Sequence, residues 1–194
     1  MSYYTLYLHQ MITIFLLLSL LEFIVLIGFI FLSLTQIIAV FTTDAPFVSV
    51  PDEIDDEIID NLELAQDSIL YDLGCGDAKV LIKAIKKIQG IQAVGVEKSL
   101  IPYFLAKFNS RKHNNIQIRR EDIFSTDISS ATHIFVYLST KAVNKLFGNI
   151  KNQCKKGVRL ISCDFELNSI SPDKIVELDN SNKRIGKKLF IYTI

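Results

Sequence analysis

The chain has 194 residues, and its 21 basic and 21 acidic side chains balance. A balanced charge provides no global attraction to nucleic acid, so a polyanion is disfavoured as the partner. All the basic residues lie from Lys79 onward, and residues 1–43 contain a single acid, Glu22. The three cysteines form no CxxC pair, which predicts a reduced compartment and no metal site.

Residues 11–41 are almost entirely apolar, with Glu22 as their one ionisable side chain. A bilayer core of ~30 Å needs ~20 apolar residues in helix, so one tilted span fits this segment. A cleavable signal peptide would begin with a basic region, whereas residues 1–10 contain no Lys or Arg. We therefore expect residues 1–43 to be a membrane anchor with one transmembrane helix at 11–41.

Glu22 is costly in lipid, and two explanations stay open. It contacts a partner helix, or it lies near one interface of an over-long segment and reaches water there; the second is favoured. The positive-inside rule cannot orient the span, because no Lys or Arg lies near either end.

Residues 44–51 read as a short linker, and residues 52–194 as one domain. The domain begins with an acidic helix whose apolar residues share one face, namely Ile54, Ile58, Ile59 and Leu62. Its acids are expected to form a solvated face near the positive end of the helix dipole.

Beyond Asp67, strands alternate with helices. The expected strands are residues 68–73, 91–97, 115–120, 132–138 and 157–165, followed by a closing hairpin of 173–179 and 187–194. The expected core stripes of the three helices are Leu81, Ala84, Ile85 and Ile88; Ile101, Phe104, Leu105 and Phe108; and Val143, Leu146, Phe147 and Ile150. Strands separated by helices form parallel sheets. The predicted fold is α/β, a doubly wound, mostly parallel, seven-stranded Rossmann-like sheet with a C-terminal antiparallel hairpin.

Two glycines follow the first strand, in the sequence YDLGCGDAKV. In such sheets ligands bind at the carboxyl ends of the strands, and Gly74 and Gly76 let the backbone approach a ligand closely. A glycine-lined turn without a ligand is the alternative, because a G-x-G pattern alone is weak evidence.

An acid follows or ends each of three successive strands, and the ordered set describes a nucleoside-shaped pocket. Asp72 precedes the glycines, Glu97 is placed to hold both hydroxyls of a ribose, and Asp122 is placed beside an adenine. Lys79 occupies the position of the last glycine in the dinucleotide fingerprint, which disfavours a nicotinamide cofactor. A ligand with an ammonium tail suits Asp72 better, and S-adenosylmethionine carries an ammonium, a ribose and an adenine in this order.

The YDLGCGDAKV sequence resembles the first motif of class I, seven-strand S-adenosylmethionine-dependent methyltransferases. AVGVEKS, REDIF and the final KKLFIYTI resemble later landmarks of that fold. Within the class, VSVPDE, GVEKSLIPYFLAKF and FVYLST are similar to a family of small membrane-anchored protein-lysine methyltransferases. Its animal members modify the c subunit of ATP synthase and the adenine nucleotide translocase, and it has microbial relatives.

The resemblance implies the roles of seven residues. The methionine part of the cofactor would be wrapped by Asp72, Gly74, Cys75 and Gly76. Glu97 would hold the ribose, and Asp122 with Ile123 would hold the adenine. The family commonly has glycine at the place of Ala78. The extra methyl group either tightens the pocket or merely repacks the start of the helix.

The resemblance also puts acceptor contacts at the end of the fourth strand. Tyr137 is the candidate for lining the acceptor channel or orienting an amine, and a tyrosine packed at the sheet edge is the alternative. The Asn- or Asp-Pro-Pro-aromatic tetrapeptide of base-amine methylases is missing at this point, which argues against a nucleic-acid acceptor. Asp164 is expected to be a solvated loop acid.

Together these features predict a membrane-anchored methyltransferase that acts on lysine side chains of a membrane protein, with S-adenosylmethionine as cofactor and no metal. The alternative is a catalytically silent, membrane-tethered S-adenosylmethionine-binding sensor or scaffold. Because the cofactor is cytosolic, the catalytic domain is expected on the cytosolic side of a single-pass protein.

Overall fold

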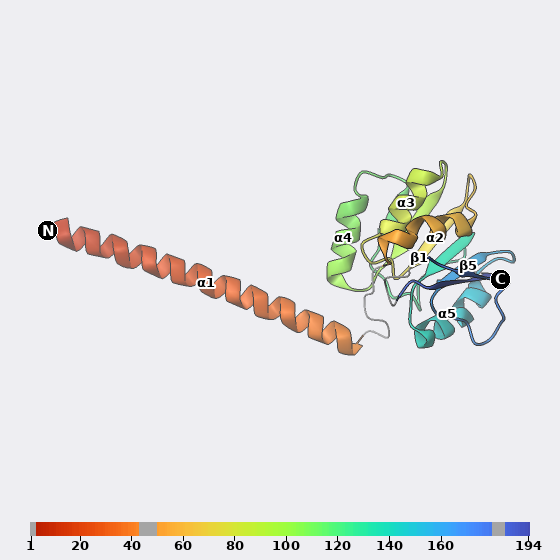
Figure 1. Ribbon diagram of the computed structural model, residues 1–194. Coiled ribbons are helices and arrows are strands. Elements are labelled where there is room, and N and C mark those ends of the chain that lie inside the picture. Colours follow the sequence, from red (N-terminus) through yellow and green to blue (C-terminus); the bar gives the residue numbers. More distant parts are fainter. Residues whose placement is uncertain (1–2, 43–49, 180–184) are drawn as a thin grey trace. The chain divides into compact units, whose positions relative to one another are not determined.

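The computed structural model describes residues 3–42, 50–179 and 185–194 (Figure 1). The chain divides into two compact units, Met1–Thr43 and Asp44–Ile194. The predicted linker at 44–51 lies, except for its last two residues, outside the described part of the chain.

The first unit contains one helix, α1 (Tyr3–Thr42). Its segment Tyr7–Ile37 is long and apolar enough to cross a membrane. The hydroxyl groups of Thr13 and Ser33 each donate a hydrogen bond of 2.8 Å to the main-chain carbonyl four residues earlier. These hydroxyls therefore bring no unpaired polar group into an apolar surrounding. Glu22 is exposed along the same helix.

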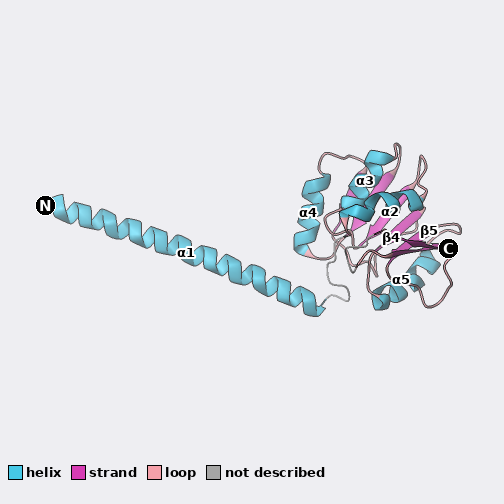
Figure 2. Ribbon diagram, in the orientation of Figure 1, coloured by secondary structure: helices cyan, strands magenta, loops and turns pink. Residues whose placement is uncertain are grey.

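The second unit is built on a seven-stranded sheet of order β3-β2-β1-β4-β5-β7-β6; Figure 2 shows its strands in magenta between the helices. The strands are β1 (Ile69–Leu73), β2 (Gln92–Val96), β3 (Ile116–Arg119), β4 (His133–Val136), β5 (Arg159–Cys163), β6 (Lys174–Glu177) and β7 (Lys188–Thr193). The pairs among β1 to β5 are parallel, and β7 is antiparallel to both β5 and β6. The predicted mostly parallel sheet with a closing hairpin is confirmed.

Helices cover both faces of this sheet. They are the 3-10 helix η1 (Asp52–Ile54) and the helices α2 (Asp55–Leu62), α3 (Lys79–Lys87), α4 (Leu100–Ser110) and α5 (Thr140–Gln153). One core cluster joins the sheet to η1, α2 and α3, and a second joins its other face to α5. This three-layer arrangement is the doubly wound α/β architecture.

The acidic helix α2 packs as its apolar pattern predicts, since all four residues of the stripe are buried. Its acids do more than face solvent. Asp56 forms an ion pair with Lys83 at 2.8 Å, and Asp60 forms one with Lys87 at 2.5 Å. Such exposed pairs contribute little energy individually, but here they connect α2 to α3.

The predicted core face of α4 is wrong. Phe104 and Phe108 are 60% and 62% exposed, and Ile101 and Leu105 are exposed as well. The buried residues of the helix are Ala106 and Ser110, whose small side chains allow the helix backbone to lie close to β3 and α3.

The sheet reverses its strand order between β1 and β4. β2 and β3 lie on one side of β1, whereas β4 and β5 lie on the other. Loops leaving the carboxyl ends of β1 and β4 therefore diverge, and a crevice opens at this point in folds of this kind.

Candidate functional site

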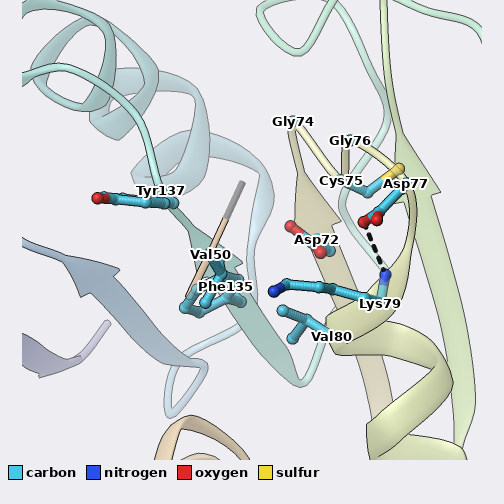
Figure 3. Close-up of a pocket in the computed structure, with 10 residues that line it drawn as sticks. All are labelled: Val50, Asp72, Gly74, Cys75, Gly76, Asp77, Lys79, Val80, Phe135 and Tyr137. Carbon is cyan, nitrogen blue, oxygen red and sulfur yellow. Dashed lines mark hydrogen bonds between the residues drawn. The ribbon is translucent and has the colours of Figure 1, made fainter. Parts of the chain in front are cut away.

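A hollow lies at the carboxyl ends of β1 and β4 (Figure 3). Its walls come from the glycine turn, the first turn of α3, β4 and the segment before α2, through Val50, Asp72, Gly74, Cys75, Gly76, Asp77, Lys79, Val80, Phe135 and Tyr137. Four of the seven residues predicted to hold the cofactor therefore meet here, together with the predicted acceptor residue.

The glycine turn is fixed by hydrogen bonds to the end of the neighbouring strand. The main-chain N–H groups of Gly74 and Cys75 both donate to the Val96 carbonyl, at 2.8 Å and 3.1 Å. Gly74 and Gly76 have φ angles of 93° and 56°, which glycine adopts without steric cost. Gly74 and Gly76 therefore present only main-chain atoms to the hollow.

Asp72 is buried at the end of β1, with 3% of its surface exposed. Burial raises the pKa of its carboxyl group to about 8, and the nearby charges of Glu97 and Asp77 add to the shift. Without a ligand the group is therefore largely protonated at neutral pH. A cation placed beside it would favour the ionised form, so Asp72 is suited to bind an ammonium group.

Cys75 contributes its main chain to the hollow, because its thiol is turned into the core. In Figure 3 the sulfur points away from Asp72. A Cβ atom on Gly95 would meet the Cys75 Sγ at 2.7 Å, so the thiol occupies the space that glycine leaves in β2. Burial raises the pKa of this thiol far above its ordinary value, which favours the protonated thiol over a thiolate.

Glu97 connects the glycine turn to the start of α4. Its Oε2 accepts a hydrogen bond from the Gly76 N–H at 3.2 Å, and its Oε1 accepts one from the Ser99 N–H at 2.7 Å. Each carboxylate oxygen still has a lone pair to offer. The carboxylate is therefore held in one orientation and remains able to accept two hydroxyl donors.

Asp122 and Ile123 lie outside the hollow, on the side of β2 and β3. The Asp122 carboxylate accepts a hydrogen bond from the Phe124 N–H at 3.0 Å and pairs with Lys98 at 2.9 Å. These contacts lower its pKa, the Phe124 bond contributing most. Lys98 directly follows Glu97, so the two carboxylates lie on adjacent loops. Ile123 is half-buried against the second core cluster.

Tyr137 is joined to Asp164, the acid that was expected to be solvated in a loop. Its hydroxyl donates to Asp164 Oδ2 at 3.0 Å, and Asp164 also accepts the N–H groups of Gly186 and Lys187, each at 2.6 Å. Burial, followed by the Asp164 charge, raises the pKa of Tyr137 above its ordinary value. The phenol therefore stays neutral at physiological pH, and the prediction for Asp164 is wrong.

Five lining residues were not predicted as site residues, namely Val50, Asp77, Lys79, Val80 and Phe135. Lys79 extends from α3 into the hollow (Figure 3) and forms an ion pair of 3.8 Å with Asp55, which is buried. Its position in the first turn after the glycines was the available signal. Val50 comes from the segment before α2, where no periodicity marks it.

Ala78 has a φ of 66° and is fully buried in the first core cluster. It is not among the residues that line the hollow. Of the two alternatives for its methyl group, the geometry favours repacking of the helix start over a tighter pocket.

Known proteins match part of this chain. Residues 72–174 match the family described as the ANTKMT methyltransferase domain. A protein-lysine N-methyltransferase of Saccharolobus islandicus (strain REY15A) is 29% identical over 152 residues, which are 77% of this chain and 93% of the relative. A lysine N-methyltransferase of Xenopus laevis, named for the c subunit of ATP synthase, is 24% identical over 110 residues, which are 55% of this chain and 48% of that protein.

Solved structures share the fold. An RNA methyltransferase from Salinibacter ruber, in complex with S-adenosyl-L-homocysteine, has a TM-score of 0.70 and 28% identity, covering 76% of this chain and 94% of its own. A precorrin-6y C5,15-methyltransferase from Geobacter metallireducens GS-15 has a TM-score of 0.57 and 14% identity, covering 78% and 92%, which shows a common fold alone.

The chemistry of the site fits S-adenosylmethionine. A buried carboxyl group at Asp72 suits its ammonium, a carboxylate fixed by two N–H groups at Glu97 suits its vicinal hydroxyls, and a turn without side chains at Gly74 and Gly76 suits close contact with its tail. The predicted resemblance is confirmed by the sheet order and by the match over more than half of the sequence. This chain belongs to the ANTKMT methyltransferase domain family.

Proposed function

We propose that the chain is an S-adenosylmethionine-dependent protein-lysine methyltransferase that works at a membrane surface. The observation that carries the proposal is that the glycine turn connects Asp72, which lines the hollow together with Tyr137, to Glu97, which follows β2 and accepts a hydrogen bond from the Gly76 N–H. The names of the Saccharolobus and Xenopus relatives support a lysine acceptor.

In this proposal each part of the cofactor has its own partner. Asp72 pairs with the ammonium, the main chain of Gly74, Cys75 and Gly76 contacts the methionine part, and Glu97 accepts the ribose hydroxyls. The loop of Asp122 and Ile123 holds the adenine. When bound, S-adenosylmethionine supplies a methyl group on a positively charged sulfur, which an amine can displace in line.

The acceptor lysine would enter between Tyr137 and the apolar walls at Val50 and Phe135. A lysine amine has a pKa of ~10.4 and reacts only after losing its proton, and burial among apolar groups favours that loss. Because the Tyr137 hydroxyl donates to Asp164, its oxygen remains an acceptor for an amine N–H. It would thereby direct the amine lone pair, and such positioning contributes up to ~7–11 kcal/mol to catalysis.

Residues 1–43 would anchor the enzyme, and residues 52–194 would form the catalytic domain on the cytosolic side, where the cofactor is supplied. The apolar segment Tyr7–Ile37 of α1 supports this division by its length and composition. Confinement to a bilayer raises the effective concentration of the enzyme near membrane-bound acceptors.

The experiment is methyl transfer from labelled S-adenosylmethionine to membrane fractions, with the full chain and its Tyr137→Phe and Glu97→Ala variants. We expect label in protein, recovered as methyllysine, and strongly reduced by both substitutions. Total RNA serves as the second acceptor because of the Salinibacter structure; label in RNA alone would overturn the lysine assignment. Cofactor binding without transfer to either acceptor would favour the silent sensor instead.

A further inference from the structure

The outward face of α4 is a continuous apolar surface. Five large side chains between 36% and 62% exposed form it, and we call them the α4 apolar face: Leu100, Ile101, Phe104, Leu105 and Phe108. At about 100° per residue they fall within an arc of about 140° on the helix. Exposed apolar patches of this kind mark contacts with partners or membranes.

Cations accompany this face along the sequence. Residues 98–120 contain six basic residues and no Asp or Glu, whereas residues 52–67 contain eight acids and no base. The Arg111 guanidinium lies 3.8 Å from the centre of the Phe108 ring, and Lys107 and Lys112 are exposed. The domain is therefore polarised although the whole chain is neutral.

An anionic bilayer surface fits this combination better than a protein groove does. Helices that lie in the interface pair Phe and Leu on one face with Lys and Arg beside it, and each cation near an anionic surface contributes about 1 kcal/mol. The seven residues 43–49 between α1 and the described start of the domain span at most about 25 Å in any conformation. If α1 crosses the bilayer, as the proposed function holds, the domain stays within reach of the headgroups.

We propose that α4 lies on the anionic membrane surface, with the α4 apolar face inserted into the interface and the surrounding cations on the headgroups. The helix is linked to the site at both ends. The Ser99 N–H donates to Glu97, and the Asn109 side chain donates to the Asp77 carbonyl at 3.1 Å. Membrane contact through α4 thus sets the distance between the hollow and the headgroups.

The test uses the absence of tryptophan from the sequence. Three full-length variants, each with a single tryptophan, are reconstituted into vesicles of zwitterionic and anionic lipids with brominated acyl chains. Phe104→Trp reports on α4 and Phe23→Trp on α1. Ile175→Trp is the matched control, because Ile175 is 50% exposed on the edge strand β6. Retained binding of S-adenosylhomocysteine shows that each variant is folded.

We expect brominated lipid to reduce Phe104→Trp emission about threefold, as for an indole within the interface, and to leave Ile175→Trp unchanged. Adding Arg111→Glu and Lys112→Glu should weaken this quenching. If Phe104→Trp were quenched no more strongly than Ile175→Trp, the proposal for α4 would be overturned. If Phe23→Trp were still quenched in that experiment, the proposal that α1 anchors the chain in the membrane would stand. Without quenching by lipid, a shift of the Phe104→Trp emission on adding RNA would assign the α4 apolar face to RNA, and a shift with rising protein concentration would assign it to a second copy of the chain. Either result would also overturn the proposal.

Discussion

The hydroxyl of Tyr137 donates a 3.0 Å hydrogen bond to the carboxylate of Asp164, which joins the carboxyl ends of β4 and β5. The same carboxylate accepts main-chain N–H groups from the loop before β7, at Gly186 and Lys187. The C-terminal hairpin therefore determines the orientation of Tyr137, the residue proposed to position the lysine amine.

Tyr137→Phe should leave folding nearly intact and reduce methyl transfer. The substitution removes one hydrogen bond, with a loss of about 1 kcal/mol in the free energy of unfolding. We expect kcat to fall at least about tenfold, as for a lost positioning contact, with unchanged affinity for S-adenosylhomocysteine. Steady-state kinetics measure kcat, and calorimetry measures the affinity. An unchanged kcat would show that Tyr137 only packs at the edge of the sheet.

Asp164→Ala should destabilise the domain more than Tyr137→Phe does. Its carboxylate accepts several main-chain N–H groups that would lose their partner, so we expect a loss on the order of 3 kcal/mol. Asp164→Asn is the matched control, because it keeps an acceptor oxygen and tolerates the φ of 60° at this position. Urea denaturation distinguishes them; equal losses for both would contradict the hydrogen-bond account.

Asp72→Asn should stabilise the ligand-free protein while weakening cofactor binding. The folded pKa of about 8 exceeds the ordinary 3.8, so the native form holds the extra proton. The contribution of Asp72 to the free energy of unfolding is therefore greatest below about pH 4 and falls as pH rises towards 8. We expect Asn, which stays neutral, to raise the Tm by about 3 °C or more at pH 8 and by roughly a third of that amount at pH 5. Calorimetric scans at both values check this.

The same carboxyl group makes cofactor affinity depend on pH. Binding of an ammonium requires ionised Asp72, so affinity for S-adenosylhomocysteine should rise between pH 6 and 8, by up to about tenfold per unit. Asp72→Asn should abolish this rise. A variant that kept the wild-type slope would show that another group titrates.

Glu97→Ala should reduce affinity for S-adenosylhomocysteine about 100-fold, because a charged acceptor for two hydroxyls is lost. It also leaves the N–H groups of Gly76 and Ser99 without their acceptor. Glu177→Ala is the control, since Glu177 pairs with Lys188 in the hairpin, away from the hollow. Titration calorimetry measures the affinity of both variants for S-adenosylhomocysteine. Similar affinities of the two variants would show that Glu97 does not bind the cofactor.

Gly95→Ala should disturb the glycine turn through the side chain of Cys75. The new Cβ would lie 2.7 Å from the Cys75 Sγ and 2.8 Å from a Leu81 methyl group. Such overpacking costs about 1–3 kcal/mol, and displacement of Cys75 should weaken cofactor binding. Gly148→Ala in α5 meets nothing within 4 Å, so it should raise stability by about 0.5–1 kcal/mol. Opposite shifts in Tm are the expected result.

Much of the fold was accessible from sequence, because its signals are local. The stripe at Ile54, Ile58 and Leu62 marks a helix face by period alone, and the alternation of strands and helices determines a parallel sheet. The order of Asp72, Glu97 and Asp122 was informative for the same reason, since the carboxyl ends of neighbouring parallel strands share one edge.

The rest depended on tertiary context. An apolar stripe identifies a face of α4 but not what covers it, and Ala106 and Ser110 on the other side were the overlooked sign of close packing. The hydrogen bonds of Asp164 could not be predicted from the sequence, because its partners include main-chain N–H groups, which every residue except proline carries. The glycine at position 186, which adopts a φ of 69° in the structure, was the available sign of the turn that contacts Asp164.

The place of β7 has a consequence for biosynthesis. This strand follows all the others along the chain, yet it is inserted between β5 and β6. While the ribosome is still translating the first 180 residues, β5 lacks its antiparallel neighbour and the Asp164 carboxylate lacks its main-chain donors. The nascent polypeptide therefore cannot complete the hydrogen bonds around Tyr137 and Asp164 before β7 emerges, so this side of the hollow is assembled last.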